Sequence, residues 1–248
     1  MPNTSLIFSG GLTPSDVTLN NVRAIQNVDL VIAADSGLHT AQKLEMHVDF
    51  VIGDFDSVDE SALARATSAH TQAIRHSADK DFTDLESALL LAVDKNSQHI
   101  IIVTAGGGRL DHQFGFVAAM FNPKLRDCKV EALWHNNRLF ALQGPVTREI
   151  TTQVGDTFGL QSFSSKSEKI STSGLQWQLT NESLNNFETR GVSNIATKEQ
   201  VSVSVELGQL LANLGWVSAL FIGLVHCDHD WNTSRLSVVQ RFDGLRHH

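Results

Sequence analysis

The stretch LVIAADSG, residues 30–37, decides the fold, because four apolar residues lead directly into a small acidic loop. Two further runs have the same form: FVI at residues 50–52 precedes GDFDS, and IIIV at residues 100–103 precedes TAGGG. Such short apolar runs are typical of strands that are buried on both faces of a parallel sheet. Patterns of helical period lie between the runs, at residues 38–46, 61–69 and 85–93. The alternation of strand and helix predicts an α/β domain with a parallel sheet.

The pattern changes after about residue 142, where short alternating stretches replace the helical ones. The segment VSVSV at residues 201–205 alternates with a strict period of two, and TFGL at residues 157–160 follows a Gly-Asp turn. This pattern predicts a C-terminal antiparallel β domain, which we expect to be a β-sandwich. We predict three segments: an α/β domain at residues 1–143, a β domain at 144–211 and an extension of unknown role at 212–248.

Composition excludes several classes of protein. Lys and Arg number 19 against 27 Asp and Glu, for a net charge of −8, so we expect no nucleic-acid partner. The two cysteines, Cys128 and Cys227, can build neither a disulfide framework nor a four-cysteine zinc site. The N-terminus lacks a basic signal region, and the apolar run at residues 210–225 is too short for a membrane span, so we interpret that run as buried core. These features favour a cytoplasmic location without a membrane. The segment HCDHD at residues 226–230 resembles a cluster of metal ligands, but we interpret it as a set of ordinary surface residues.

Acidic residues gather in the loops that follow the predicted strands. Six carboxylates occupy these loops: Asp35, Asp54, Asp56, Asp79, Asp81 and Asp84. Asp54 and Asp56 are two residues apart, so in extended backbone their side chains point the same way, and like charges held together require a cation. A single aspartate after a strand commonly caps a helix or closes a turn, but turns do not require the whole set. The set predicts a Mg²⁺ site, because Mg²⁺ prefers carboxylates and substrate phosphates.

A glycine-rich loop, TAGGGRLDH at residues 104–112, follows the run at residues 100–103. Its glycines allow backbone N–H groups to approach a phosphate, and Arg109 can bind phosphate oxygens as a fork. The loop is neither a Walker A motif nor a dinucleotide-binding motif. Alone it could be an ordinary connection from strand to helix, but beside an acidic metal site it favours phosphate binding.

Six motifs occur in an order that resembles the thiamine pyrophosphokinase family. They are AADSG (residues 33–37), GDFDS (53–57), KDFTD (80–84), GGGRLDH (106–112), STSGLQWQL (171–179) and GVSN (191–194). The resemblance implies an enzyme, a thiamine diphosphokinase, that transfers a diphosphate from ATP to the hydroxyethyl group of thiamine and releases AMP. It also implies an α/β domain that binds ATP and Mg²⁺, a β domain that binds thiamine and dimerises, and a homodimer whose sites are shared between subunits.

The resemblance also implies roles for individual residues. Asp54, Asp56 and Asp84 correspond to Mg²⁺ ligands, and together with Asp81 they form the expected catalytic set. The positions expected around the nucleotide and its phosphates are Asp35, Ser57, Lys80, Thr104, Gly107, Gly108, Arg109 and Asp111. Trp177, Ser193 and Asn194 correspond to the thiamine-binding side. Asp81 or Asp35 is the expected acceptor of the hydroxyl proton.

Two alternatives stay open at this stage. The chain could transfer diphosphate to another alcohol, such as a hydroxymethylpterin, although the GLQWQL and GVSN segments favour thiamine. It could instead be a non-catalytic sensor of thiamine or nucleotide, although three carboxylates suited to Mg²⁺ argue against that interpretation.

Overall fold

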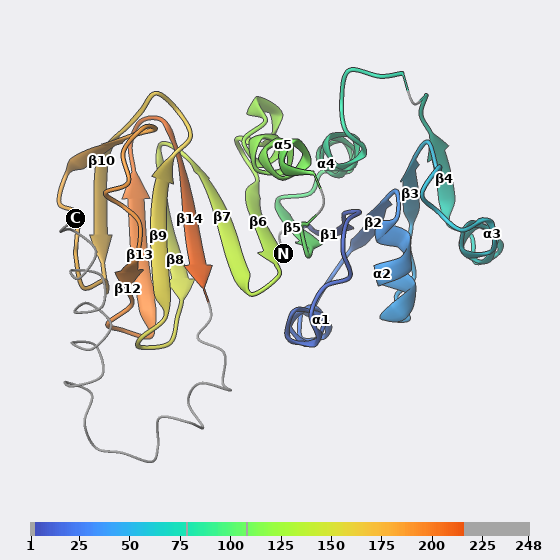
Figure 1. Ribbon diagram of the computed structural model, residues 1–248, viewed down its shortest axis with the longest axis horizontal. Helices are drawn as coiled ribbons and strands as arrows, with labels where there is room; N and C mark the ends of the chain where they lie inside the picture. The colour runs from blue at the N-terminus through green and yellow to red at the C-terminus, as the bar shows by residue number, and fades with distance from the viewer. Residues whose placement is uncertain (1–2, 78, 108, 216–248) are drawn as a thin grey trace, which may run out of the picture. The chain divides into compact units, whose positions relative to one another are not determined.

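The computed structural model describes residues 3–77, 79–107 and 109–215 (Figure 1). The HCDHD segment and all of the predicted extension after residue 215 lie outside the described residues, as does Gly108. Within the described ranges, no helix is long and apolar enough to cross a membrane.

One large sheet runs through both halves of the described chain, in the order β12-β9-β14-β7-β6-β5-β1-β2-β3-β4. Its parallel part consists of β1 (Thr4–Phe8), β2 (Leu30–Ala34), β3 (Phe50–Gly53), β4 (Gln72–Arg75), β5 (His99–Thr104) and β6 (Lys129–Trp134). Its antiparallel part adds β7 (Asn137–Gln143), β14 (Gln209–Gly215), β9 (Thr157–Ser162) and β12 (Asn194–Ile195). The predicted parallel sheet is confirmed.

Helices cover both faces of the parallel part (Figure 1). Helices α4 (Asp84–Asp94) and α5 (Leu110–Met120) pack on one face, where Leu89 and Met120 meet Ile100 and Ile102. On the other face lie α1 (Asp16–Arg23), α2 (Gly37–Lys43) and α3 (Glu60–Ser68). A short 3₁₀ helix, η1 (Pro123–Leu125), follows α5. In a strand that is buried on both faces, polar residues cannot alternate with apolar ones, because every side chain points into a core. This explains the apolar runs in the sequence.

A second, antiparallel sheet has the order β11-β10-β13-β8. Its strands are β11 (Glu182–Asn185), β10 (Lys166–Ser173), β13 (Gln200–Val205) and β8 (Val146–Thr151). The valines of β13 are buried and its serines are half-buried, as the period of two predicted. A hydrophobic core, separate from those on the two faces of the parallel part, lies between this sheet and strands β7, β9 and β14. It includes residues such as Phe140, Phe158 and Leu210. The expected antiparallel sandwich is present, and one of its layers is continuous with the parallel sheet.

The predicted segment boundaries fall at particular places in this topology. The boundary at residues 143 and 144 lies between β7 and β8, where the chain passes from the large sheet to the small one. Strand β14 extends to Gly215, so residues 212–215 of the predicted extension belong to the large sheet. The part of the apolar run at residues 210–225 that the structure describes is this strand, and most of it is buried.

Candidate active site

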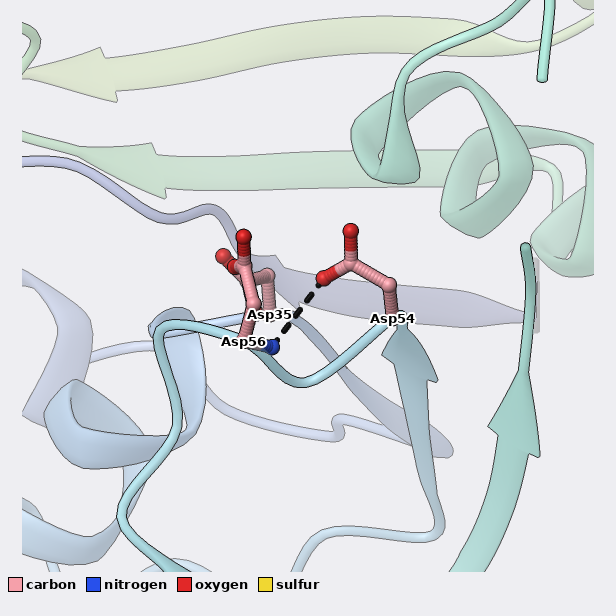
Figure 2. Close-up of side chains that lie close together, drawn as sticks. All are labelled: Asp35, Asp54 and Asp56. Carbon is pink, nitrogen blue, oxygen red and sulfur yellow. Dashed lines mark hydrogen bonds between the residues drawn. The ribbon is translucent and has the colours of Figure 1, made fainter. Parts of the chain in front are cut away.

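Three aspartates come together at the carboxyl ends of two neighbouring parallel strands. Asp35 follows β2, and Asp54 and Asp56 follow β3. One carboxylate oxygen of each residue lies within 4.8 Å of the others (Figure 2). Parallel strands direct their carboxyl ends to one edge of the sheet, so loops far apart in sequence meet there. Asp35 was expected beside the nucleotide, and the structure groups it with the predicted metal pair.

A tight turn brings Asp54 and Asp56 together. Strand β3 ends at Gly53, and Phe55 has a φ of +66°, in the left-handed region. The Asp56 backbone N–H donates to Asp54 Oδ1 over 3.1 Å, which closes the turn (Figure 2). The expectation of extended backbone between the two residues was therefore wrong, although the carboxylates lie together as predicted.

The cluster concentrates negative charge. The charge of Asp54, followed by burial and the charge of Asp35, raises the pKa of Asp56 above its ordinary value. Asp35 Oδ2 accepts a hydrogen bond from the Ser57 hydroxyl, but Asp35 Oδ1 is buried without a hydrogen-bond partner in the described part of the chain. A buried carboxylate oxygen without a partner is costly, and a cation would compensate for it.

Asp84 lies outside this three-residue cluster. It is the first residue of α4, and its Oδ1 lies 2.5 Å from the ammonium of Lys80. The charge of Asp84 still contributes to raising the pKa of Asp56, so the two carboxylates influence each other. The structure thus pairs two predicted site residues with each other, Lys80 with Asp84.

A cavity of about 710 Å³ lies against the acidic cluster. It is within the size range of small-molecule sites. Among the predicted site residues, its lining includes Asp35, Asp54, Lys80, Asp84, Thr104, Gly107 and Arg109. The lining does not include Asp56, Ser57, Asp81 or Asp111. Asp111 instead pairs with Arg109 through two hydrogen bonds of 2.5 and 3.1 Å.

The glycine-rich loop forms one wall of the cavity. Gly106 and Gly107 have φ values of +63° and +83°. A Cβ on Gly106 would lie 2.3 Å from the indole nitrogen of Trp134, so the loop can pack there only as glycine. The Gly106 N–H donates to Thr104 Oγ1 over 3.0 Å, which fixes the start of the loop. The loop backbone therefore packs closely against the Trp134 side chain, and its phosphate role stays a prediction.

Sequence reasoning missed several residues of the cavity lining, among them Gly10, Gly11 and Trp134. The apolar run Leu6-Ile7-Phe8 is followed by Ser9 and then by the glycine pair. This was a usable signal for the two glycines, because small residues also follow the other apolar runs. Trp134 belongs to no motif, and only the packing of β6 beside the glycine loop places it there.

The predicted thiamine-binding residues lie at the other end of the large sheet, with Asn194 in β12 and with Trp177 and Ser193 in loops. The Asn194 side chain accepts a hydrogen bond from the Trp177 backbone N–H over 3.1 Å and donates to the Trp177 carbonyl over 2.6 Å. Trp177 is 58% exposed, and Ser193, which precedes Asn194 in the chain, is exposed as well. Asn194 begins β12, which is seven strand positions from β2. At a strand spacing of about 4.8 Å this is about 34 Å along the sheet, so one chain does not bring Trp177 to its own acidic cluster.

Two family models match the chain on either side of β7. The model "Thiamin pyrophosphokinase, catalytic domain" matches residues 22–132, and "Thiamin pyrophosphokinase, vitamin B1 binding domain" matches residues 147–210. The chain belongs to the thiamin pyrophosphokinase family. The acidic cluster lies in the first matched segment, and Trp177 with Asn194 lies in the second.

Individual relatives agree with this assignment. The chain is 29% identical over 198 residues to thiamine pyrophosphokinase 1 of Arabidopsis thaliana, which covers 73% of this chain and 69% of the relative. It is 30% identical over 110 residues to thiamine pyrophosphokinase of Bacillus subtilis (strain 168), which covers 44% of this chain and 51% of the relative. The chain spans 61 to 69% of the length of its plant relatives.

The fold agrees as well. A crystal structure of thiamine pyrophosphokinase from Bacillus subtilis superposes with a TM-score of 0.74 at 22% identity, over 86% of this chain and 99% of that chain. Thiamin pyrophosphokinase from Candida albicans gives a TM-score of 0.71 at 16% identity, over 86% of this chain and 89% of that chain.

Proposed function

We propose that this protein is a thiamine diphosphokinase, which transfers a diphosphate from ATP to the hydroxyethyl group of thiamine and yields thiamine diphosphate and AMP. The observation that carries the proposal is the acidic cluster beside a cavity whose other groups are a glycine loop, Lys80 and Arg109. The matched vitamin B1 binding domain favours thiamine over a hydroxymethylpterin.

The residues fit a Mg²⁺ ion. All candidate ligands are carboxylate oxygens, and Asp35 Oδ1 is buried without a hydrogen-bond partner in the described chain. Asp54 and Asp56 would hold the ion, and Asp84 is the third ligand predicted from the sequence. Asp35 belongs to the same cluster of carboxylates as Asp54 and Asp56. A bound Mg²⁺ would neutralise charge on the phosphate oxygens.

The chain's own groups would bind and orient the substrates. Lys80 and Arg109 carry positive charge at the cavity wall, where the triphosphate of ATP would bind, and the glycine loop would admit the phosphates closely. The thiamine hydroxyl must lose a proton as it attacks the β-phosphorus and AMP leaves. Asp35 lines the cavity and Asp81 does not, so Asp35 is the better placed of the two predicted acceptors.

We propose that the enzyme is a homodimer with sites shared between subunits. Trp177 is exposed, its backbone is held by Asn194, and it lies about 34 Å along the sheet from Asp35 by strand spacing. An exposed aromatic ring held in place is suited to stack on the pyrimidine ring of thiamine. A second chain could bring its own Trp177, Ser193 and Asn194 to the acidic cluster of the first.

We also propose a cytoplasmic location. The sequence has only two cysteines, Cys128 and Cys227, and disulfide frameworks are typical of oxidising compartments rather than of the cytoplasm.

The reaction is tested by measuring AMP release from ATP in the presence of Mg²⁺, with thiamine or a hydroxymethylpterin as the acceptor. Release that requires thiamine and stops when Mg²⁺ is chelated supports the proposal. Release only with the pterin would establish the alternative substrate. Thiamine binding without any AMP release, in protein shown to be folded, would establish the sensor alternative.

The shared site is tested by mixing Asp56→Ala, which we expect to be inactive, with Trp177→Ala, which we expect to be impaired. The mixture is assayed at a thiamine concentration well below the KM, under conditions that exchange subunits. Random pairing makes half of the dimers heterodimers, each with one site free of both changes, so about a quarter of wild-type activity is expected. Phe187→Ala is a control, because Phe187 is 81% exposed and belongs to no predicted site, so it should be active without mixing. No gain on mixing, with exchange verified by mass, would show that each site is built within one chain.

A further inference from the structure

Arg75 makes two contacts with the turn that carries the acidic pair. It is the last residue of β4, the edge strand, and it lies opposite Gly53 of β3 in the parallel register. Its Nη1 donates a hydrogen bond to the Asp54 carbonyl over 2.7 Å. Its guanidinium carbon lies 4.8 Å from the centroid of the Phe55 ring. One side chain therefore contacts two consecutive residues of the turn.

The turn needs such support because of its backbone conformation. Phe55 has a φ of +66°, which is an outlier for a bulky side chain. Glycine would adopt this conformation freely. Phe55, however, is only 9% exposed, and its side chain belongs to the hydrophobic core on the face of the sheet that α1, α2 and α3 cover. The left-handed residue turns the chain so that the Asp56 N–H reaches Asp54 Oδ1. Both carboxylates therefore depend on Phe55 staying in an unfavourable conformation.

We propose that Arg75 is a positioning residue for the proposed metal site, which holds the Asp54-Phe55-Asp56 turn in its left-handed conformation through the Asp54 carbonyl and the Phe55 ring. The inference rests on the proposed function and adds a residue from a strand that no motif covers. Arg75 acts from outside the cavity, because it is absent from the cavity lining. It donates to a backbone carbonyl, so both carboxylates remain available to a cation.

The alternative role for Arg75 is purely electrostatic, and the two roles predict opposite signs. A positive charge near the acidic cluster repels a metal ion, so removing it should strengthen metal binding if charge is its only effect. Removing a positioning residue should weaken metal binding, because the carboxylates lose their fixed arrangement. The direction of the change therefore distinguishes the two roles.

The experiment measures Mn²⁺ binding to the full chain by electron paramagnetic resonance of free Mn²⁺, which needs no turnover. Arg75→Met, which has neither the donor nor the charge, should bind Mn²⁺ about 10-fold more weakly, as expected for the loss of a charge-assisted hydrogen bond. Arg75→Lys keeps a charge and a donor but lacks the planar group, so an intermediate loss of about 3-fold is expected. Arg65→Met is the matched control, because Arg65 on α3 contacts Ser61 and Gln42 and not the acidic turn, so its affinity should equal that of wild type.

Each outcome decides the inference. Weaker binding by folded Arg75→Met, with the KM for thiamine unchanged and kcat reduced, supports positioning. Binding equal to or tighter than wild type overturns it, while the proposed function stands if AMP release persists. If Arg75→Met does not fold, Arg75→Lys carries the test, and wild-type affinity in that variant overturns the inference. Absence of Mn²⁺ binding in the wild type itself would overturn the metal site and the inference together.

Discussion

Glu131 offers a sharp test of what holds the sheet together at β5, β6 and β7. It is fully buried in β6, with 0% of its surface exposed. Its Oε1 lies 2.6 Å from His99 Nε2 of β5, and its Oε2 lies 2.9 Å from Arg138 Nη2 of β7. Glu131→Met preserves a buried side chain of similar length but removes the only carboxylate of this group. Arg138, which is one-third exposed, then loses its partner.

The size of the expected loss in unfolding free energy follows from the burial of Glu131. Breaking a buried ion pair by removing one partner costs about 3–5 kcal/mol of unfolding free energy, because the remaining charge is uncompensated. In a chain of this size a loss of 1 kcal/mol lowers Tm by about 2–4 °C, so a decrease of about 6–20 °C is expected. Urea unfolding followed by circular dichroism gives the free energy, and Glu149→Gln on the exposed side of β8 is the control. A loss below about 1 kcal/mol would refute the reasoning, since that is the value of an exposed pair.

The pH dependence has a definite sign. Burial opposes the charge of Glu131, but the hydrogen bond with His99 and the charges of Arg138 and Lys129 outweigh it, so the pKa of Glu131 lies below its ordinary value of 4.5. A lowered folded-state pKa means that the stabilisation is complete above pH 4.5 and is lost as the pH falls through the lower folded value. The stability difference between wild type and Glu131→Met should therefore be full at pH 7 and shrink in acid. A difference that grows in acid would contradict this assignment.

Three further predictions concern the proposed site. Asp56→Ala should abolish AMP release while the circular dichroism spectrum stays unchanged, and near-normal release in Mg²⁺ would remove Asp56 from the site. Trp177→Ala should raise the KM for thiamine by about 10-fold, through the loss of about 1–3 kcal/mol of ring contact, and leave the KM for ATP unchanged. Equal changes in both constants would indicate a folding defect instead. Gly106→Ala should raise the KM for ATP and spare that for thiamine, because the new Cβ would meet the Trp134 indole, whereas Gly115→Ala meets nothing within 4 Å and serves as the control. If the two glycine variants have the same KM for ATP, the loop does not contact the nucleotide.

The parallel half of the fold was predictable because its strands are buried on both faces. Ile100 and Ile102 face α4 and α5, whereas Ile101 and Val103 face the opposite cluster, so neither side of β5 accepts a polar residue. The continuity of the sheet was not predictable in the same way. Strand β7 pairs with β14 through contacts such as Leu142 with Leu210, and local pattern carries no information on such distant partners.

The sequence was sufficient to predict which loops form the acidic site, but not which side chains pair with one another in it. The approach of Asp35 to Asp54 and Asp56 follows from parallel strand ends meeting at one edge. The pairing of Lys80 with Asp84 depends on the conformation of the loop that precedes α4, since Lys80 lies in this loop and Asp84 is the first residue of the helix. Their spacing in the sequence permits the pair but does not require it. Arg75 was missed because its contacts come from the neighbouring strand, and no motif includes it.

The pairing of β7 with β14 also has a consequence for synthesis of the chain on the ribosome. The outer edge of β7 ends at Gln143, and its partner strand begins only at Gln209, 66 residues later. At translation rates of about 5–20 residues per second, this edge of β7 remains unpaired for about 3–13 s until β14 is synthesised. During this interval the nascent α/β half presents unpaired backbone N–H and C=O groups, which are a template for pairing with other chains. Expression at lower temperature or with chaperones that shield nascent chains should therefore raise the soluble yield, and a chain truncated after residue 143 should aggregate.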